Sequence, residues 1–133
     1  MSIPRRRFLR AGGALAASSL VFPSIVKAEN LGSQKLRVAV IGVGGRGRSH
    51  VSELMSEELV AFCDVDDDRA AQTFRRYPKV PRFKDFRVMF DKMGKNLDAV
   101  SIAAPDHMHY PTALWAIAHG KHILVKKPLV RTV

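Results

Sequence analysis

The sequence predicts an α/β protein in which a parallel sheet is covered by helices on both faces. Short apolar runs rich in β-branched residues alternate with segments whose apolar residues recur at helical spacing. A glycine-rich turn follows the first apolar run, and an acidic residue ends the second. Strands that alternate with helices in this way form parallel sheets, because each strand returns to the same edge through a crossover helix.

The first strand, expected over 36–41, is followed by Gly42, Gly44 and Gly47 in G-x-G-x-x-G spacing. Gly42 makes a tight turn off the strand, Gly44 lets a pyrophosphate approach the backbone, and Gly47 lets the next helix pack against the strand. That helix directs its free N–H groups and its positive dipole end at the phosphates. The motif therefore predicts a Rossmann-type dinucleotide-binding fold.

The segment after the glycines has the spacing of a helix. We expect this helix to begin at Arg46 or Gly47 and to end near Met55. Its inward face is expected to carry Val51, Leu54 and Met55. The apolar run that follows is a second buried strand.

This second strand, expected over 59–64, ends at Asp64, about 20 residues beyond the first glycine. A carboxylate at this point can accept hydrogen bonds from both ribose hydroxyls of the adenosine half. Asp64 could instead cap the next helix, but the aspartates of 66–68 stand closer to that helix. We therefore place Asp64 on the ribose. An acid there repels a 2′-phosphate, so NAD is favoured over NADP, and the nearby Arg69 leaves NADP open.

The rest of the chain continues the alternation of strands and helices. Asp85 is the expected N-cap of a helix that Gly94 ends, and the apolar residues of this helix recur at core spacing. The expected elements are a short strand within 80–83, a helix over 86–93, a strand over 97–104, a loop over 105–109, a helix over 111–119 and a strand over 122–125.

The composition is that of an ordinary globular protein, with 47% hydrophobic and 26% charged residues among 133. The formal charge of +10 would suit nucleic acid, but several of the 22 basic residues lie in the first 28 residues. The other basic residues are mostly scattered, so we expect no nucleic-acid partner, and such binding stays a minor alternative. Cys63 is the single cysteine, which excludes an internal disulfide and predicts a buried, inert thiol.

Residues 1–28 are expected to be an export signal and not part of the fold. Arginines precede Phe8 and Leu9 in the pattern R-R-x-F-L, a mostly apolar stretch spans 11–26, and cleavage is expected after Ala28. The segment resembles a twin-arginine signal, which predicts a periplasmic or otherwise exported protein that meets the membrane only through this signal. A membrane anchor or an uncleaved signal is the alternative. We expect a linker over 29–34 and one domain over 35–133.

Four motifs in order, GVGGRG, CDVD, APDHMH and GKHILVKKPL, resemble the N-terminal domain of the Gfo/Idh/MocA oxidoreductases from Leu36 to Val133. The resemblance implies an NAD(P)-dependent enzyme that oxidises or reduces a hydroxyl or carbonyl group of a sugar, inositol or related polyol. It also implies a second α+β domain, carrying a catalytic histidine and most substrate contacts, beyond the point where this sequence ends. We therefore expect the Rossmann domain over 35–133 to be incomplete, truncated before its last strand, as the nucleotide-binding part of a longer enzyme. A homo-oligomer is open for the full-length form. The alternative is a non-catalytic dinucleotide-binding remnant, or a subunit whose site another chain completes.

The resemblance also implies roles for individual residues. Lys127 would be catalytic, because an ammonium group beside the nicotinamide and the substrate hydroxyl can polarise the reacting oxygen. Pro128 follows it and is often joined by a cis bond in this family. The family's Glu before this Lys-Pro pair is Lys126 here, which changes the local charge. His107 and His109 could ligate a metal, but no third ligand is specified, so none is predicted. The implied cofactor-binding residues are Gly42, Gly44, Arg46, Gly47, Asp64, Pro105, Asp106, His109, Lys127 and Pro128.

Overall fold

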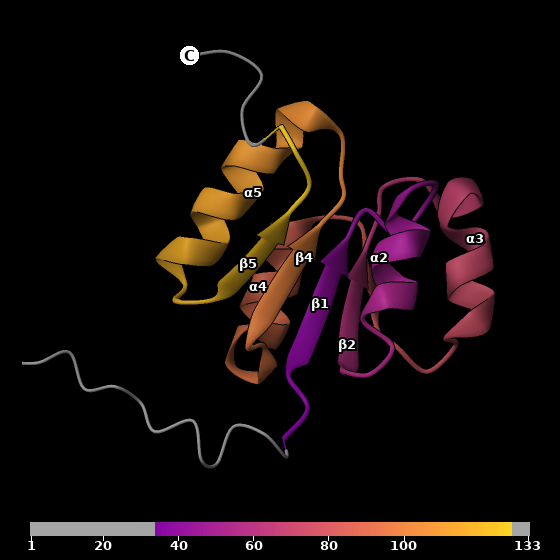
Figure 1. The fold of residues 1–133 in the computed structure, drawn as a ribbon, viewed down its shortest axis with the longest axis horizontal. Helices are drawn as coiled ribbons and strands as arrows, with labels where there is room; N and C mark the ends of the chain where they lie inside the picture. Colours follow the sequence, from indigo (N-terminus) through magenta and orange to yellow (C-terminus); the bar gives the residue numbers. More distant parts are fainter. Residues whose placement is uncertain (1–33, 129–133) are drawn as a thin grey trace, which may run out of the picture. The chain divides into compact units, whose positions relative to one another are not determined.

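The computed structural model describes residues 34–128, which form a five-stranded parallel sheet with helices on both faces (Figure 1). The strand order is β3-β2-β1-β4-β5, and each neighbouring pair is parallel. The predicted signal segment 1–28 and nearly all of the predicted linker 29–34 lie outside the described residues. Residues 129–133 lie outside them as well. The predicted fold class is confirmed.

The elements follow one another as alternating strands and helices. They are β1 (Arg37–Ile41), α2 (Gly47–Glu53), β2 (Glu58–Cys63), α3 (Asp67–Arg76), β3 (Arg82–Phe83), α4 (Phe86–Met93), the 3₁₀ helix η2 (Gly94–Asn96), β4 (Ala99–Ile102), α5 (Asp106–Ala118) and β5 (His122–Val125). In the described part of the chain, no helix is both long and apolar enough to span a membrane.

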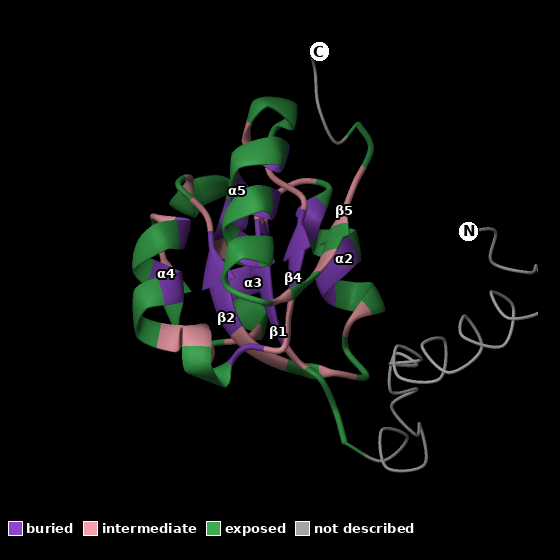
Figure 2. Ribbon diagram, turned by 90° about the vertical axis from the view of Figure 1, so that its left-hand side faces the viewer, coloured by how far each residue is buried: buried purple, intermediate pink, exposed green. Residues whose placement is uncertain are grey.

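Two apolar clusters lie on the two faces of the sheet. On one face, Val40 and Phe62 pack with residues of α2 and α3. On the other, Ala39 and Ile41 pack with residues of α4 and α5. Successive residues of β1 therefore point to opposite faces, which is why its apolar run is continuous and not alternating. Figure 2 shows the buried residues concentrated on the strands, with the outer sides of the helices exposed.

Aspartates begin two of the helices. The Asp66 carboxylate accepts hydrogen bonds from the backbone N–H groups of Asp68 and Arg69 at the start of α3. Asp85 accepts from Arg87 N at the start of α4, as predicted. Because Asp66 caps α3, Asp64 is not needed for that role.

Two expectations about the helices were wrong. Met55 was expected to face the core, but α2 ends at Glu53 and Met55 is 50% exposed. The stretch 105–109 was expected to be a loop, whereas α5 begins at Asp106. Proline is favoured at the first position of a helix, so Pro111 indicated a start there. The competing signal is Asp106, an acid in the first turn, where the helix dipole favours negative charge.

The single cysteine is buried, as predicted. Cys63 ends β2 and is 3% exposed. Burial, and to a smaller degree the nearby Asp64 carboxylate, raises the pKa of the thiol to about 12. The thiol therefore stays protonated and unreactive at neutral pH.

Candidate functional site

The predicted site residues lie at one edge of the sheet. Because all strands are parallel, the segments that leave β1, β2, β4 and β5 emerge at the same edge (Figure 1). These segments carry the glycine motif, Asp64, the Pro105–Asp106 pair and the Lys127–Pro128 pair respectively. In open α/β sheets, ligands bind at this edge, where the strand order reverses. The reversal here falls between β1 and β4.

Two of the glycines are required by backbone crowding. Gly42 has a φ of +82°, and a Cβ on it would lie 2.6 Å from the backbone nitrogen of Ala104. A Cβ on Gly47 would lie 1.6 Å from the carbonyl oxygen of Gly42. No side chain fits at either position, so the glycines allow the tight turn and the close helix packing that the motif predicts.

The other two glycines of the loop have different surroundings. A Cβ on Gly44 would lie 3.0 Å from backbone and side-chain carbons of Arg69, so Gly44 allows α3 to approach the loop. Gly45, which the spacing did not single out, has a φ of +52°. Its left-handed backbone is also favourable to glycine. The loop therefore depends on one more glycine than its motif indicated.

Asp64 fastens the glycine loop to the end of β2. Its Oδ2 accepts hydrogen bonds from the backbone N–H groups of Val43 and Gly44, each at 2.9 Å. Its Oδ1 accepts from Asp66 N at 3.0 Å. Each carboxylate oxygen can accept about two hydrogen bonds, so Oδ1 keeps capacity for a ligand hydroxyl. Asp64 thus has a structural role beside the predicted contact with the ribose.

Further hydrogen bonds hold the loop from behind. Gly42 N donates to Cys63 O at 2.7 Å, and the buried Thr73 hydroxyl donates to Val43 O at 2.9 Å. The Arg48 guanidinium donates to Gly45 O at 3.2 Å. These contacts fix the loop before any ligand binds, so less conformational entropy is lost on binding.

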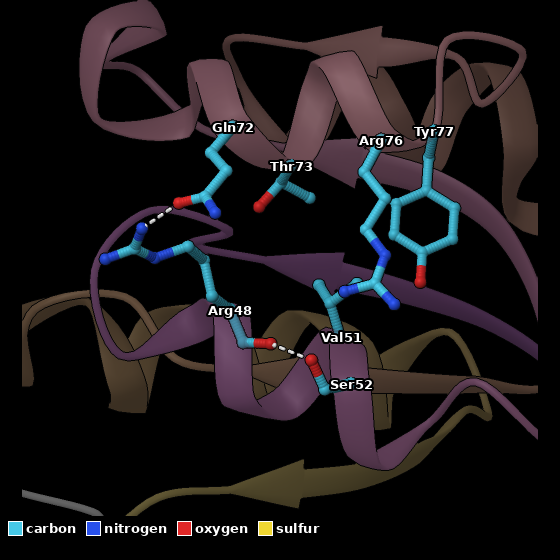
Figure 3. A pocket seen from close by; sticks show the side chains of 7 residues that line it. All are labelled: Arg48, Val51, Ser52, Gln72, Thr73, Arg76 and Tyr77. Carbon is cyan, nitrogen blue, oxygen red and sulfur yellow. Dashed lines mark hydrogen bonds between the residues drawn. The ribbon is translucent and has the colours of Figure 1, made fainter.

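A small pocket between α2 and α3 lies behind the loop. Figure 3 shows that Arg48 also donates to the Gln72 side chain across the pocket. Two of its residues, Arg48 and Thr73, are among those that brace the loop. The pocket holds none of the predicted site residues, and its lining consists of Arg48, Val51, Ser52, Gln72, Thr73, Arg76 and Tyr77.

Two backbone amides of the loop remain available. Within residues 34–128, neither Gly45 N–H nor Arg46 N–H has a hydrogen-bond partner. Both precede α2, and the Arg46 side chain is exposed. Free amides at the start of a helix are suited to binding phosphate oxygens. The loop therefore fits the pyrophosphate of a dinucleotide.

The segments after β4 and β5 meet through a histidine. His109 is 2% exposed. Its Nε2 lies 2.7 Å from Ala104 O, and its Nδ1 lies 2.7 Å from Pro128 O. The expected contact of His109 with the cofactor stays a prediction, but both ring nitrogens face backbone carbonyl oxygens. The Lys127–Pro128 peptide bond is cis, as the resemblance led us to expect.

The remaining predicted residues of this part are more open. Pro105 precedes α5, Asp106 begins it, and both are exposed. Lys127 is exposed, whereas Lys126 before it is half-buried. His107 is exposed whereas His109 is buried, so the two side chains of the H-x-H pattern have different surroundings. Across residues 34–128, no three His, Cys, Asp or Glu side chains gather as metal ligands would.

One buried polar pair was missed. His50 of α2 and Ser101 of β4 are both buried, with His50 Nδ1 2.7 Å from the Ser101 hydroxyl. Burial, and then the charge of Lys126, lowers the pKa of His50, so the ring is held neutral. His50 stands three residues after Gly47 and one before Val51, which places it on the inward face of the helix. That spacing was the signal that could have found it.

The geometry defines a class of protein first: a Rossmann-type domain with a preformed loop for the pyrophosphate of a dinucleotide. A family model described as "Oxidoreductase family, NAD-binding Rossmann fold" matches residues 36–133. The chain belongs to this family, the Gfo/Idh/MocA oxidoreductases. The family and the NAD cofactor predicted from the sequence are thereby confirmed.

Curated proteins similar to the chain include proteins named as glycosyl hydrolases. A protein named alpha-N-acetylgalactosaminidase from Shewanella oneidensis is 33% identical over 99% of this chain and 35% of its own length. The chain thus spans about a third of the length of the curated relatives it matches.

Solved structures similar to the chain include dehydrogenases. The WlbA dehydrogenase from Bordetella pertussis, crystallised with NADH and UDP-GlcNAcA, is 25% identical, with a TM-score of 0.63 over 73% of this chain and 30% of that one. A myo-inositol 2-dehydrogenase from Lactobacillus plantarum is 28% identical, with a TM-score of 0.64 over 73% of this chain and 29% of that one.

Proposed function

We propose that the chain is the nucleotide-binding part of an NAD-dependent oxidoreductase that acts on a sugar, inositol or related polyol. The observation that carries the proposal is the glycine loop, which Asp64 holds at the edge of the sheet with two amides free. The resemblance to dehydrogenases of inositol and of a UDP-sugar supports the substrate class.

In this proposal different residues bind different parts of the cofactor. The amides of Gly45 and Arg46 donate to the pyrophosphate, and the Arg46 guanidinium adds positive charge. Gly42 and Gly47 allow the tight turn that presents these amides, and Gly44 allows α3 to approach the loop. The bound nicotinamide supplies the hydride acceptor or donor. The remaining roles fall to residues at the ends of β2, β4 and β5.

Asp64 Oδ1 accepts a ribose hydroxyl, and its charge disfavours a 2′-phosphate. Pro105 and Asp106, after β4, line the nicotinamide side. The Lys127 ammonium polarises the substrate oxygen and holds a proton at Nζ, and Pro128 fixes the backbone beside it. His109 acts on this site through its contact with Pro128.

The experiment is a titration of the purified full chain with NADH, followed by nucleotide fluorescence. We expect saturable binding that excess NAD⁺ reverses. An Asp91→Ala variant should bind equally well, because Asp91 is exposed and lies on α4, which carries none of the predicted site residues. Sugar and polyol substrates are then tested by NADH formation with the longer enzyme of which this chain is proposed to be a part. Absence of NADH binding by a folded chain would contradict the proposal.

A second candidate reaction is cleavage of a glycosidic bond by a protein of the same family. The relative named alpha-N-acetylgalactosaminidase, which matches 99% of the chain, favours it. Release of the leaving group from an aryl N-acetylgalactosaminide, without net NADH formation, distinguishes this reaction from dehydrogenation. The non-catalytic alternative, a binding subunit completed by another chain, predicts NADH binding and neither reaction.

We also propose that residues 1–28 export the protein by the twin-arginine route. The support is in the sequence alone, in the R-R-x-F-L pattern and in Val26-Lys27-Ala28, where Val26 and Ala28 are small enough for cleavage after Ala28. Replacing Arg5 and Arg6 by Lys should keep the protein in the cytoplasm with its leader uncleaved. Mass spectrometry of the periplasmic fraction measures both effects, and unchanged export of this variant would contradict the assignment.

A further inference from the structure

The ring of His109 contacts two separate segments of the chain. It lies in the second turn of α5 and is buried. One ring nitrogen faces Ala104 O in the turn after β4, and the other faces Pro128 O in the segment after β5. A single side chain therefore connects the end of β4 to the segment that carries Lys127.

The chemistry of these contacts depends on protonation. A carbonyl oxygen only accepts hydrogen bonds, so each contact requires the ring nitrogen to donate. A neutral imidazole has one N–H and can donate to one of the two oxygens, whereas the doubly protonated ring donates to both. The connection is complete only in the protonated form.

The segment has few other attachments. In the described chain, residues 126–128 are held by two hydrogen bonds: Lys126 N donates to Ile102 O at 3.3 Å, and Pro128 O faces His109. The first is long and at the end of the β4–β5 ladder. The contact with His109 is shorter, at 2.7 Å, and the His109 side chain is buried, so this contact has the larger influence on where Lys127 lies.

The charged groups around His109 come from two elements. Asp106 and His107 stand on the same helix, and Lys126 and Lys127 stand on the segment after β5. The chain from Ala99 to Pro105 carries no charged side chain, and His122 lies at the far end of β5.

We propose that His109 is a positioning residue, whose protonated ring joins the ends of β4 and β5 and thereby sets the place of Lys127. The importance of Lys127 rests on the proposed function, but the connection itself does not. The expected consequence is a segment 126–128 that is held firmly at lower pH and loosens as pH rises.

Hydrogen exchange of backbone amides in the full chain tests this directly. The Lys126 amide reports on the segment, and the Gly42 amide, which donates to Cys63 O, serves as an internal reference for the effect of pH on exchange chemistry. We expect the protection of Lys126 relative to Gly42 to fall between about pH 5 and about pH 8, the range in which histidine changes charge.

Two phenylalanine variants form a matched pair. His109→Phe keeps a ring but removes both donors, and should raise exchange at Lys126 by about tenfold and abolish its dependence on pH. His107→Phe changes the exposed histidine of the same helix and should leave both unchanged. His109→Gln, which donates without titrating, should restore part of the protection with no pH dependence.

The proposal is overturned if His109→Phe and His109→Gln keep the protection and pH dependence of the unchanged chain. Should the phenylalanine variant not fold, the glutamine variant alone decides, because its protection must lose the pH dependence. An NADH titration of the unchanged chain is run beside these measurements. Failure to bind NADH counts against the proposed function only, since the exchange result does not depend on nucleotide.

Discussion

The two halves of the sheet hold their functional residues in different ways. The nucleotide half is defined here as β1, α2, β2 and α3. In this half the glycine loop is fixed by hydrogen bonds that Asp64 accepts and that Thr73 and Arg48 donate. The lysine half is defined as β4, α5, β5 and residues 126–128. In this half a single side chain, His109, contacts both the turn after β4 and the segment after β5.

Burial differs in the same direction. Four of the five residues of β1 are buried, whereas those of β5 alternate between exposed and intermediate, and Leu124 is 51% exposed. The comparison teaches that the cofactor loop is preformed by its own half, whereas the position of Lys127 depends on a few contacts. Changes in the nucleotide half should therefore be the more damaging.

The largest effect is expected at Gly47. Gly47→Ala places a Cβ against Gly42 O and should lower the free energy of unfolding by about 3 kcal/mol or more. Gly94→Ala is the matched control, because nothing lies within 4 Å of its Cβ position, and should raise stability by about 0.5–1 kcal/mol. Urea unfolding measures both, and equal midpoints would show that the loop is not crowded.

The next effect is expected at Asp64. Asp64→Ala leaves the Val43 and Gly44 amides without an acceptor, which should cost about 2–3 kcal/mol of stability and at least about tenfold in NAD affinity. Asp64→Asn keeps an acceptor but removes the charge, so it should raise the affinity for NADP relative to NAD. Calorimetric titration measures the affinities. If the Asn variant keeps the original preference for NAD over NADP, the charge of Asp64 does not determine that preference.

A smaller, pH-dependent effect is expected at His50, which connects the two halves through Ser101. Its folded pKa is lowered from the ordinary 6.5, so the unfolded chain binds more protons at acidic pH. The stability from neutral His50 is complete above the unfolded pKa and is lost as pH falls from there towards the folded pKa. Urea unfolding at about pH 7 and about pH 5 should show a smaller loss for His50→Gln than for the unchanged chain. Equal losses would contradict this.

The smallest effect is expected at the opposite edge of the sheet, where Arg37 of β1 forms a two-bond ion pair with Asp98 before β4. The Arg37 hydrogen bonds lower the pKa of Asp98 to about 2. Stability from this pair is therefore present above pH 3.8 and lost as pH falls towards 2. Because the pair is partly exposed, Arg37→Ala should lower stability less than Asp64→Ala does in urea unfolding near neutral pH. A loss as large as that of Asp64→Ala would contradict the small contribution expected of this partly exposed pair.

The sequence predicted the nucleotide half well, because its constraints are local. Tight turns at Gly42 and Gly47 need glycine whatever the rest of the chain does, and a buried β-branched run before them leaves few alternatives to a strand. The structural role of Asp64 was missed, and its contact with the ribose stays a prediction. Its bonds to the Val43 and Gly44 amides join segments about 20 residues apart, and spacing alone does not show which backbone groups face it.

The lysine half was predicted less well, because its contacts depend on where a helix begins. With α5 expected at Pro111, His109 belonged to a polar loop; with α5 beginning at Asp106, the same histidine is buried. Pro111 and Asp106 are competing start signals, and only packing against β4 and β5 decides between them. The His50–Ser101 pair could be anticipated in part, from the helical spacing of His50, but its partner on β4 could not.

The most direct test of the central claim is a calorimetric titration of the full chain with NAD⁺ and, separately, with NADP⁺. The preformed glycine loop and the Asp64 carboxylate predict saturable binding of NAD⁺ and an affinity for NADP⁺ at least about tenfold weaker. Equal affinities would contradict the role of Asp64 in choosing the cofactor. Binding of neither nucleotide by a chain whose unfolding is cooperative would contradict the assignment of the loop as a dinucleotide site.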